Sequence, residues 1–262
     1  MGIVNVTPDS FSDGGAFLDP ASALAHARRL IVEGADILDI GGESTRPRAE
    51  PVSEADEIAR VIPVIERVRA ESGVRISIDT MKPAVARAAV IAGATMWNDV
   101  TALTASPDSL AMAAELGCEV VLMHMQGEPR TMQAAPHYDD VVSEVATYLV
   151  ARAEAAMAAG VARENIWLDP GIGFGKTAEH SLVLLRNLDR IVALGFPVLL
   201  GASRKSSIAA IAHDRSTADQ RLGGSIAVAL AAARSGVAAV RVHDVAETVQ
   251  ALAVAEAITP HP

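Results

Sequence analysis

The stretch NIWLDPGIGFGKT, residues 165–177, places a carboxylate at the end of a predicted buried strand. The apolar run 166–168 has the length of a buried strand, and Asp169 follows it directly, before Pro170 and three closely spaced glycines. Two phosphate-binding motifs do not fit this loop. Pro170 stands where GxxxxGK[ST] needs glycine, and the GxGxG spacing differs from the dinucleotide fingerprint GxGxxG. By itself the pattern is equally typical of a strand followed by a flexible turn.

Polar or charged side chains end most of the short apolar runs in the chain. In a barrel of parallel strands the active site lies at the carboxyl ends of the strands, so these side chains are candidates for one site. Each alone is an ordinary strand-end residue that meets solvent, but their convergence in one fold indicates function. In chain order they are Asn5, Asp39, Asp79, Asn98, Asp99, His124, Asp169, Ser203, Arg204, Lys205, Arg241 and His243.

The residue types at these positions predict what the site binds. Arg241 and His243 are two apart in a strand and therefore share a face. Asp79 and Asp169 would share a partly buried cavity, where an unpaired carboxylate is costly, so they need hydrogen-bond donors. A flat heterocycle with amino and ring N–H groups would supply such donors. Arg46 would join Arg241 and His243 in a cationic cluster for a phosphate. The predicted ligand has a donor-rich ring and an anionic tail.

The elements that position these residues alternate between two hydrophobic patterns. Eight apolar runs of strand length lie near Ile3, Leu38, Ile78, Trp97, Val121, Leu168, Leu199 and Val240. Between them apolar residues recur at three- and four-residue spacing, as in residues 58–68, which indicates helices. Eight such pairs predict an α/β fold, a (β/α)₈ TIM barrel. An open doubly wound sheet is the alternative fold.

Several residues mark the predicted helix ends and the extent of the domain. Ser53 is expected to cap the second helix, and Asp244 the last one. Pro20 is expected to open the first helix and Gly34 to end it. No linker or low-complexity tract divides the chain, so residues 1–262 are predicted to be one domain that starts directly at its first strand.

Composition excludes several classes of function. Half of the 262 residues are hydrophobic and only 3% are aromatic, so the core is built mainly of Ala, Val, Leu and Ile. A net charge of -10 argues against binding to nucleic acid or to anionic membranes. The single cysteine, Cys118, rules out an internal disulfide and favours a reducing compartment. With no signal peptide and no run long enough to span a bilayer, we expect a cytoplasmic protein.

Several long motifs resemble those of the dihydropteroate synthase family, in the right order and over essentially the whole chain. The family usually has residues before the first strand, whereas this sequence starts that strand at Gly2. The matching stretches are NVTPDSFSDGG from Asn5, GGESTRP from Gly41, MHMQGEPRTMQ from Met123, YDDV from Tyr138, DPGIGFGK from Asp169, SRKS from Ser203 and RVHD from Arg241.

The resemblance implies a folate-pathway transferase. Such an enzyme joins p-aminobenzoate to 6-hydroxymethyl-7,8-dihydropterin diphosphate by an SN1-like displacement and releases pyrophosphate. The resemblance also implies a homodimer and a Mg²⁺ ion near Asn5. The implied catalytic residues are Asp79, Asp169, Lys205 and Arg241. The implied pterin residues are Asp79, Asn98, Asp169 and Lys205. Asn5, Arg46, Arg241 and His243 would hold the diphosphate, and Phe11, Thr45, Phe174 and Ser206 would hold p-aminobenzoate.

Three other functions remain open from the sequence. A pterin-binding methyltransferase domain shares the barrel and the pterin pocket, but it lacks the SRKS and RVHD motifs. A Schiff-base aldolase would use Lys205 as its nucleophile, which requires a lysine of lowered pKa; the neighbouring Arg204 disfavours this. A non-catalytic pterin-binding protein would be expected to lack the anion-binding residues that this chain has. Sensitivity to sulfonamides, which mimic p-aminobenzoate, is not decided by the sequence, and His124 has no assigned role.

Overall fold

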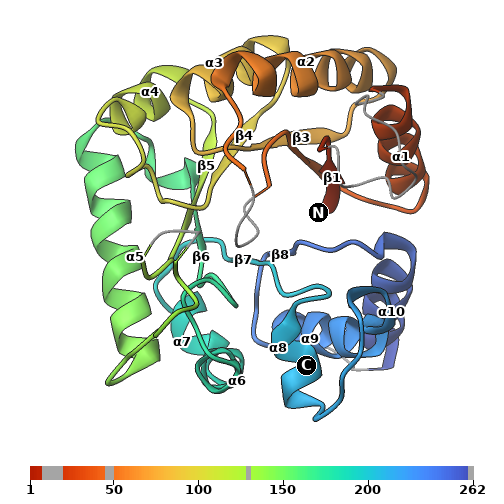
Figure 1. Ribbon diagram of the computed structural model, residues 1–262, viewed down its shortest axis with the longest axis vertical. Helices are drawn as coiled ribbons and strands as arrows, with labels where there is room; N and C mark the ends of the chain where they lie inside the picture. The colour runs from red at the N-terminus through yellow and green to blue at the C-terminus, as the bar shows by residue number, and fades with distance from the viewer. Residues whose placement is uncertain (8–19, 45–49, 128–130, 259–262) are drawn as a thin grey trace.

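The computed structural model describes residues 1–7, 20–44, 50–127 and 131–258, and these form an α/β barrel with a ring of helices outside the strands (Figure 1). The strands follow one another around the barrel in sequence order, as the prediction required. They are β1 (Gly2–Asn5), β2 (Ile37–Gly41), β3 (Arg75–Asp79), β4 (Met96–Asp99), β5 (Glu119–Met123), β6 (Ile166–Asp169), β7 (Leu199–Leu200) and β8 (Ala239–Val240).

Backbone hydrogen bonds close the strands into a barrel. Strands β1 to β6 form one parallel sheet in sequence order, and β7 pairs with β8. Parallel bridges Leu168↔Val198 and Gly2↔Val242 join the two sheets on both sides. At the closing seam Ile3 N donates to Val242 O at 3.1 Å, and Val242 N donates to Met1 O at 2.9 Å. The barrel prediction is therefore confirmed, and the open doubly wound sheet is wrong.

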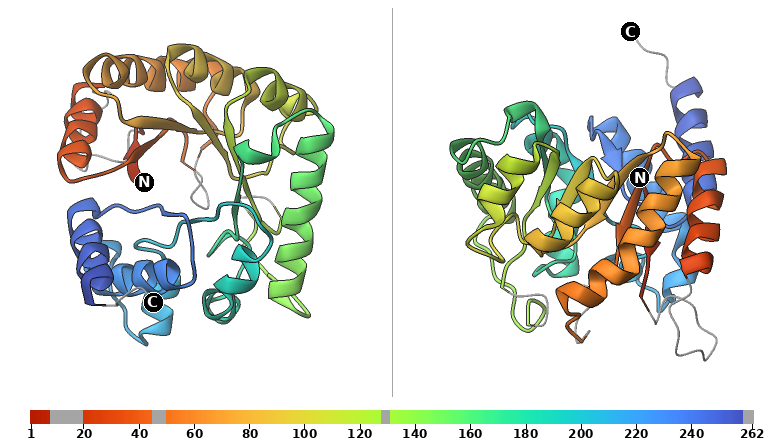
Figure 2. Two further views of the ribbon diagram at one scale, coloured as in Figure 1. Left: turned by 180° about the vertical axis from the view of Figure 1, so that it is seen from behind. Right: turned by 90° about the horizontal axis from the view of Figure 1, so that it is seen from above.

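The helices cover the outer face of the barrel, as both views in Figure 2 show. None of those in the described parts of the chain is long and apolar enough to cross a membrane. They are α1 (Pro20–Val32), α2 (Glu54–Glu71), α3 (Pro83–Ala92), α4 (Ser109–Leu116), α5 (Val141–Ala158), α6 (Ala178–Arg186), α7 (Leu188–Val192), α8 (Ser206–Ile211), α9 (Leu222–Arg234) and α10 (Val245–Ile258), with short 3₁₀ turns at Arg163–Asn165 and Ala218–Gln220.

Three of the four predicted helix ends are found, and one of them is the start of α1 at Pro20. Ser53 Oγ accepts a hydrogen bond from Asp56 N at 3.1 Å, which satisfies one of the free N–H groups that begin α2. Gly34 follows α1 with φ 96°, a conformation that favours glycine at helix ends. Asp244 does not cap α10 with its side chain, because its carboxylate accepts instead from Arg204 Nε at 3.0 Å.

Alternation along the strands separates an outer core from the inside of the barrel. Leu38 and Ile40 belong to the large cluster between strands and helices. Ile37 belongs to a smaller cluster inside the barrel, with Met96, Val121 and other residues at the amino ends of the strands. Two residues further along the same inward face of β2 comes Asp39, which is fully buried. The inside of the barrel is thus apolar at one end and polar at the other.

Candidate functional site

At the polar end of the barrel, Arg241 is held between two carboxylates from neighbouring strands. Its Nη2 donates to Asp79 Oδ2 at 2.8 Å, and its Nε donates to Asp39 Oδ2 at 2.5 Å. Asn98 Nδ2 donates to the same oxygen of Asp39 at 3.1 Å. The predicted pterin residues Asp79 and Asn98 and the predicted diphosphate residue Arg241 therefore form one network.

Asp39 is the member of this network to which the sequence assigned no role. Its position in the middle of an apolar run gave a signal, because a carboxylate there has to face a partner inside the barrel. A carboxylate only accepts hydrogen bonds, so the amide nitrogen of Asn98 must face Asp39 and its amide oxygen must face elsewhere. Asp39 thus orients both Arg241 and Asn98. Its second oxygen, Oδ1, has no hydrogen-bond partner among the described residues.

Burial and charge shift the pKa values in this network in opposite directions. Burial raises the pKa of Asp79 to about 7, against the nearby positive charge of Arg241, and the charges of Asp39 and Glu57 add to the rise. Burial lowers the pKa of Arg241, but its carboxylates Asp39 and Asp79 outweigh that effect and keep it above its ordinary value. Near neutral pH, Asp79 is therefore poised between its two protonation states.

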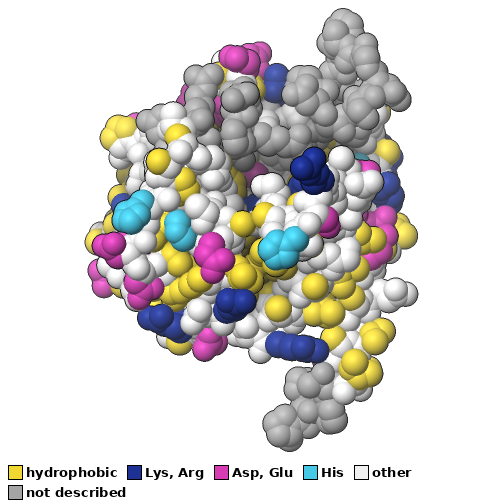
Figure 3. All heavy atoms as spheres, turned by 60° about the horizontal axis from the view of Figure 1, so that its bottom comes forward, with side chains coloured by type: hydrophobic (Ala, Val, Ile, Leu, Met, Phe, Trp, Pro, Cys, Tyr) yellow, Lys and Arg dark blue, Asp and Glu magenta, His cyan; other side chains and the backbone are white. Residues whose placement is uncertain are grey.

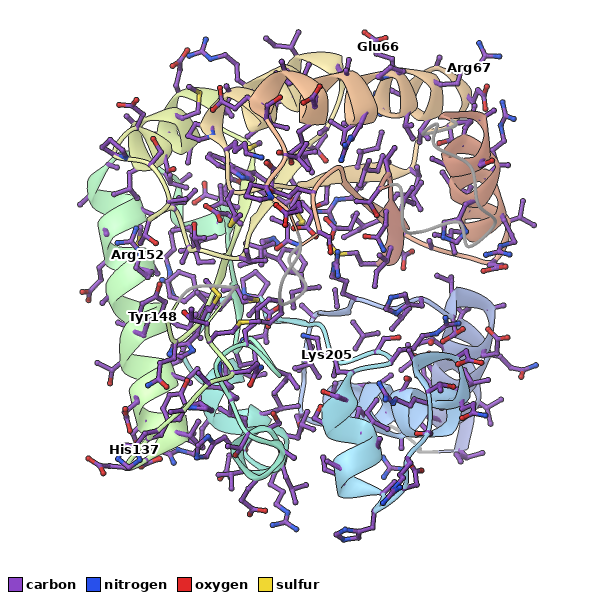
Figure 4. The ribbon with its side chains drawn as sticks, in the orientation of Figure 1. Glu66, Arg67, His137, Tyr148, Arg152 and Lys205 are labelled. Carbon is purple, nitrogen blue, oxygen red and sulfur yellow. The ribbon has the colours of Figure 1, made fainter. Side chains whose placement is uncertain are left out.

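The glycine-rich loop after β6 brings Asp169, Phe174 and Lys205 together. Asp169 Oδ1 accepts from Gly171 N at 2.7 Å, which fixes the carboxylate at the start of the loop. Lys205 Nζ donates to Ile172 O at 2.5 Å and lies 4.5 Å from the centre of the Phe174 ring. Figure 4 shows Lys205 near the middle of the barrel.

Asp169 and Lys205 moderate each other's pKa. Burial raises the pKa of the Asp169 carboxyl, and the positive charge of Lys205 opposes that rise. Burial lowers the pKa of Lys205 to about 8, and the Asp169 carboxylate opposes that fall. An ammonium donor and a carboxylate acceptor therefore lie near enough to influence each other at this end of the barrel.

Two glycines let this loop lie directly against the backbone that follows β5. A Cβ on Gly171 would stand 1.9 Å from the carbonyl oxygen of His124, and one on Gly175 would stand 2.4 Å from that of Gln126. Both residues also have positive φ, 66° and 60°. Close packing therefore requires glycine at both positions. A loop that was only a flexible turn would have no such requirement.

The SRKS segment is a strained turn that aims its lysine and serine. Arg204 has φ 58°, which is unfavourable for a residue with a side chain. Its N donates to Ser225 Oγ at 3.0 Å and its O accepts from Arg221 Nη1 at 2.9 Å. The guanidinium of Arg204 pairs with Asp244. These contacts hold Lys205 pointing inward, while Ser206 begins α8 and is exposed.

The other predicted site residues fall into three groups. Asn5 ends β1 opposite Gly41 of β2 and is half-buried. His243 follows β8, and its Nδ1 lies 3.0 Å from Ser203 Oγ. Phe11, Thr45 and Arg46 lie outside the described residues.

The predicted Mg²⁺ ion has only one candidate ligand in the described site. No group of three or more His, Cys, Asp or Glu side chains that would hold a metal occurs within residues 1–7, 20–44, 50–127 and 131–258. Mg²⁺ usually keeps several waters and takes its remaining ligands from a carboxylate or from substrate phosphates. The single amide oxygen of Asn5 fits that mode only together with a bound diphosphate.

Asp99 and His124, two further strand-end residues, serve the protein itself. Asp99 is fully buried and accepts from the N–H groups of Thr101 and Leu103 at 2.8 and 2.9 Å. It therefore shapes the loop after β4. His124 is buried after β5, against Lys176, with Nδ1 and Nζ 2.8 Å apart.

The closed barrel, with buried carboxylate, amide and ammonium groups at the carboxyl ends of its strands, defines an α/β barrel enzyme. A family model described as pterin binding enzyme matches residues 1–243. The chain belongs to this family of pterin-binding enzymes.

Its relatives share a narrower name. A dihydropteroate synthase of Neisseria meningitidis is 51% identical over 265 residues, 98% of this chain and 92% of the relative. That of Escherichia coli is 48% identical over 257 residues, 98% and 90% of the two chains. The structure of Xanthomonas albilineans dihydropteroate synthase with 4-aminobenzoic acid has a TM-score of 0.93 at 52% identity, covering 100% of this chain and 93% of the other. A Yersinia pestis dihydropteroate synthase with a sulfonamide drug has a TM-score of 0.92 at 45% identity, covering 98% and 92%.

Proposed function

We propose that this chain is a dihydropteroate synthase. It joins p-aminobenzoate to the methylene carbon of 6-hydroxymethyl-7,8-dihydropterin diphosphate, giving 7,8-dihydropteroate and pyrophosphate. One observation carries the proposal from the structure: Asp79 and Asn98 are joined with the Arg241 guanidinium in one buried network through Asp39, and the charge of Arg241 also acts on Asp169. The full-length similarity to dihydropteroate synthases supports the same reaction.

The carboxylates and the amide would bind the pterin ring. Asp79 and Asp169 accept hydrogen bonds from its amino and ring N–H groups, and Lys205 donates to a ring acceptor. The amide orientation imposed by Asp39 leaves the oxygen of Asn98 to accept from the ring. A charge-assisted hydrogen bond of this kind contributes about 1.5–3 kcal/mol. Protonation of Asp79 removes an acceptor, so we expect pterin affinity to fall on the acid side of its pKa of about 7.

The cationic side chains would act on the leaving group. When the carbon–oxygen bond breaks, the electron pair leaves with the diphosphate, and the electron-rich pterin stabilises the cation left at the methylene carbon. Arg241 and His243 stabilise the developing negative charge, an interaction that strengthens in the transition state. The aniline nitrogen of p-aminobenzoate then attacks the methylene carbon and loses a proton. This weakly basic amine needs positioning more than activation, so no dedicated general base is required.

A Mg²⁺ ion bound through Asn5 and the substrate's diphosphate would supply further neutralisation of charge on the leaving group. The protein's own part is to present the Asn5 amide oxygen at the end of β1. We propose this cofactor on the donor type of Asn5 and on the family resemblance.

The p-aminobenzoate would lie against the glycine-rich loop and the SRKS turn. Phe174 offers a half-buried ring beside the Lys205 ammonium, and Ser206 offers an exposed hydroxyl at the start of α8. We propose that a sulfonamide, which mimics p-aminobenzoate, competes for this place.

One assay tests the proposed reaction. Pyrophosphate release from the pterin diphosphate is measured with and without p-aminobenzoate, and then titrated with a sulfonamide. We expect release to depend on p-aminobenzoate and to decline as the sulfonamide is added. Release that does not depend on p-aminobenzoate would refute the transferase reaction, and release that is insensitive to the drug would refute only the competition.

One observation supports the aldolase alternative and another opposes it. The pKa of Lys205 is lowered to about 8, as a Schiff-base lysine requires. Arg204 does not disfavour this role, because its guanidinium is bound by Asp244. Against it, the Lys205 amine is already engaged by the Ile172 carbonyl and the Phe174 ring. Failure of borohydride to trap a carbonyl substrate on Lys205 would exclude the aldolase.

We also propose a cytoplasmic homodimer of one-domain chains, residues 1–262. Cys118 is a free, buried thiol, which agrees with a reducing compartment. Val249, Val254 and Ile258 of α10 are exposed by 40, 54 and 71%, and Figure 3 shows hydrophobic side chains gathered beside this end of the chain. A self-association surface there would bury them. The same charge of -10 argues against nucleic acid as a partner. Light scattering checks the oligomeric state.

A further inference from the structure

Lys176 is a buried lysine that the proposed reaction does not use. It is 3% exposed, and no carboxylate is among the hydrogen-bond partners of its Nζ in the described part of the chain. Its three partners are all uncharged acceptors: His124 Nδ1 at 2.8 Å, His124 O at 3.3 Å and Phe174 O at 3.0 Å. An ammonium group has three N–H donors, so these three acceptors can satisfy the charged form, although burial lowers the pKa of Lys176 to about 7.

The contact with Lys176 also bears on the tautomer and the protonation of His124. When Lys176 carries its charge it only donates, so Nδ1 of His124 then accepts and the ring proton is on Nε2. Burial, and then the charge of Lys176, lower the pKa of His124 to about 3, so the ring stays neutral. Its ring packs edge-on to Tyr148, with centroids 4.9 Å apart. A neutral, rigidly packed imidazole is a fixed acceptor for the lysine.

Lys176 is one of several side chains that hold the glycine-rich loop from outside. Tyr138 Oη donates to Gly175 O at 2.8 Å, and Gln133 Nε2 donates to Gly173 O. With Lys205 on Ile172 O, four successive carbonyls of the loop are each bound by a different side chain. Lys176 differs from the other three because it also joins this loop to the end of β5.

We propose that Lys176, with His124, is a positioning residue that fixes the Phe174 peptide and thereby the ring that contacts p-aminobenzoate. The inference rests on the proposed function, because it concerns the place of one of the two substrates. Lys176 acts on Phe174 directly, through its carbonyl. Asp169 is fixed separately by Gly171 N at 2.7 Å, and the charge of Lys176 acts on its pKa less than Lys205 and that hydrogen bond do, so the pterin side of the site depends on Lys176 only weakly.

Steady-state kinetics of Lys176→Met test the proposal. We expect the KM for p-aminobenzoate to rise roughly tenfold, the effect of losing one hydrogen bond from a charged donor, while kcat falls less than about threefold. The calorimetric affinity for the pterin diphosphate should stay within about twofold. Leu30→Ala is the matched control for lost stability, because Leu30 is fully buried against the start of β1 at the opposite end of the barrel. It should leave the KM for p-aminobenzoate unchanged.

His124→Leu tests the same positioning role independently, and it remains a test if Lys176→Met does not fold. It removes the ring acceptor and should raise the KM for p-aminobenzoate in the same direction. Combined with Lys176→Met, it should add less than its separate effect, because both variants break one contact. An unchanged KM in both single variants, or equal weakening of both substrates, would overturn the positioning role. An inactive wild-type enzyme with normal pterin binding would instead overturn the proposed function.

Discussion

Replacement of Arg241 by methionine tests whether the site is built around a buried charge network. The variant keeps much of the apolar stem but leaves Asp39 and Asp79 without their shared cation. Asp39 is fully buried, and the Asp79 side chain is 13% exposed, so water cannot replace the guanidinium fully. Removing one partner from a buried ion pair typically costs about 3–5 kcal/mol. We expect a loss of that order in the free energy of unfolding at pH 8.

The loss should shrink as the pH falls. The pKa of Asp79 is about 7 in the folded protein even beside Arg241, above its ordinary value of 3.8. Without the arginine it should rise further. A carboxyl whose folded pKa is raised binds its proton more tightly in the folded state, so lowering the pH through that pKa stabilises the fold. Each unit of pKa difference is worth about 1.4 kcal/mol. Because the wild-type Asp79 also takes up a proton over this range, we expect the variant to recover only roughly 1 kcal/mol relative to the wild type between pH 8 and pH 6.

Urea unfolding of both proteins at pH 6, 7 and 8 measures this difference. Asp39→Asn in the Arg241→Met background is the matched control, because it removes one of the two stranded charges and should restore part of the stability at pH 8. A loss below about 1 kcal/mol, or one that is identical at all three pH values, contradicts a buried network that depends on Arg241.

The same contact changes what the sequence predicted for Arg241. A residue that only held the diphosphate would not affect the affinity for a pterin without the diphosphate. Because the charge of Arg241 opposes protonation of Asp79, its loss should instead weaken the bare pterin near neutral pH, and lower pH should not restore that binding. Calorimetry of the bare pterin with the variant decides between the two expectations.

The remaining predictions concern the loop, the histidine, the pterin and the metal. Gly171→Ala should cost more than about 2 kcal/mol and most activity, whereas Gly117→Ala, with similar φ but nothing within 4 Å, should cost only about 1 kcal/mol by chemical denaturation. Burial lowers the pKa of His124 to about 3, so its contribution to the free energy of unfolding is fully present above pH 6.5 and falls by on the order of a few kcal/mol towards pH 3. His124→Leu should make the free energy of unfolding depend less on pH in acid titrations. Asp169→Asn should weaken the binding of the bare pterin and of its diphosphate alike, by about 1.5–3 kcal/mol in calorimetry. If the variant binds both ligands as tightly as the wild type does, Asp169 is not a pterin ligand. Excess chelator should stop pyrophosphate release and Mg²⁺ should restore it; full activity in chelator would exclude the ion.

Local sequence patterns were sufficient for the architecture of this protein. Alternating apolar runs and amphipathic segments predicted the strands and helices, and their number predicted the barrel. Parity within a strand predicted which side chains share a face, because successive residues point to opposite sides of the strand. The residue types separately predicted that Asp79 is partly buried, and the structure has its carboxylate 13% exposed and paired with Arg241. The assigned binding roles of these residues stay predictions.

Contacts between distant strands were decided only by closure of the barrel. Arg241 is 202 residues from Asp39 and 162 from Asp79, so no local pattern pairs them. The sequence divided these residues between a ring-binding half and an anion-binding half, but β8 lies beside β1 and brings them into one network. The role of Lys176 is equally non-local, because its acceptors include a ring and a carbonyl 52 residues away. Sequence alone determines which elements form and which faces are buried, since these depend on neighbours along the chain. Which buried charges meet depends on the geometry of the closed barrel, and only the tertiary structure shows it.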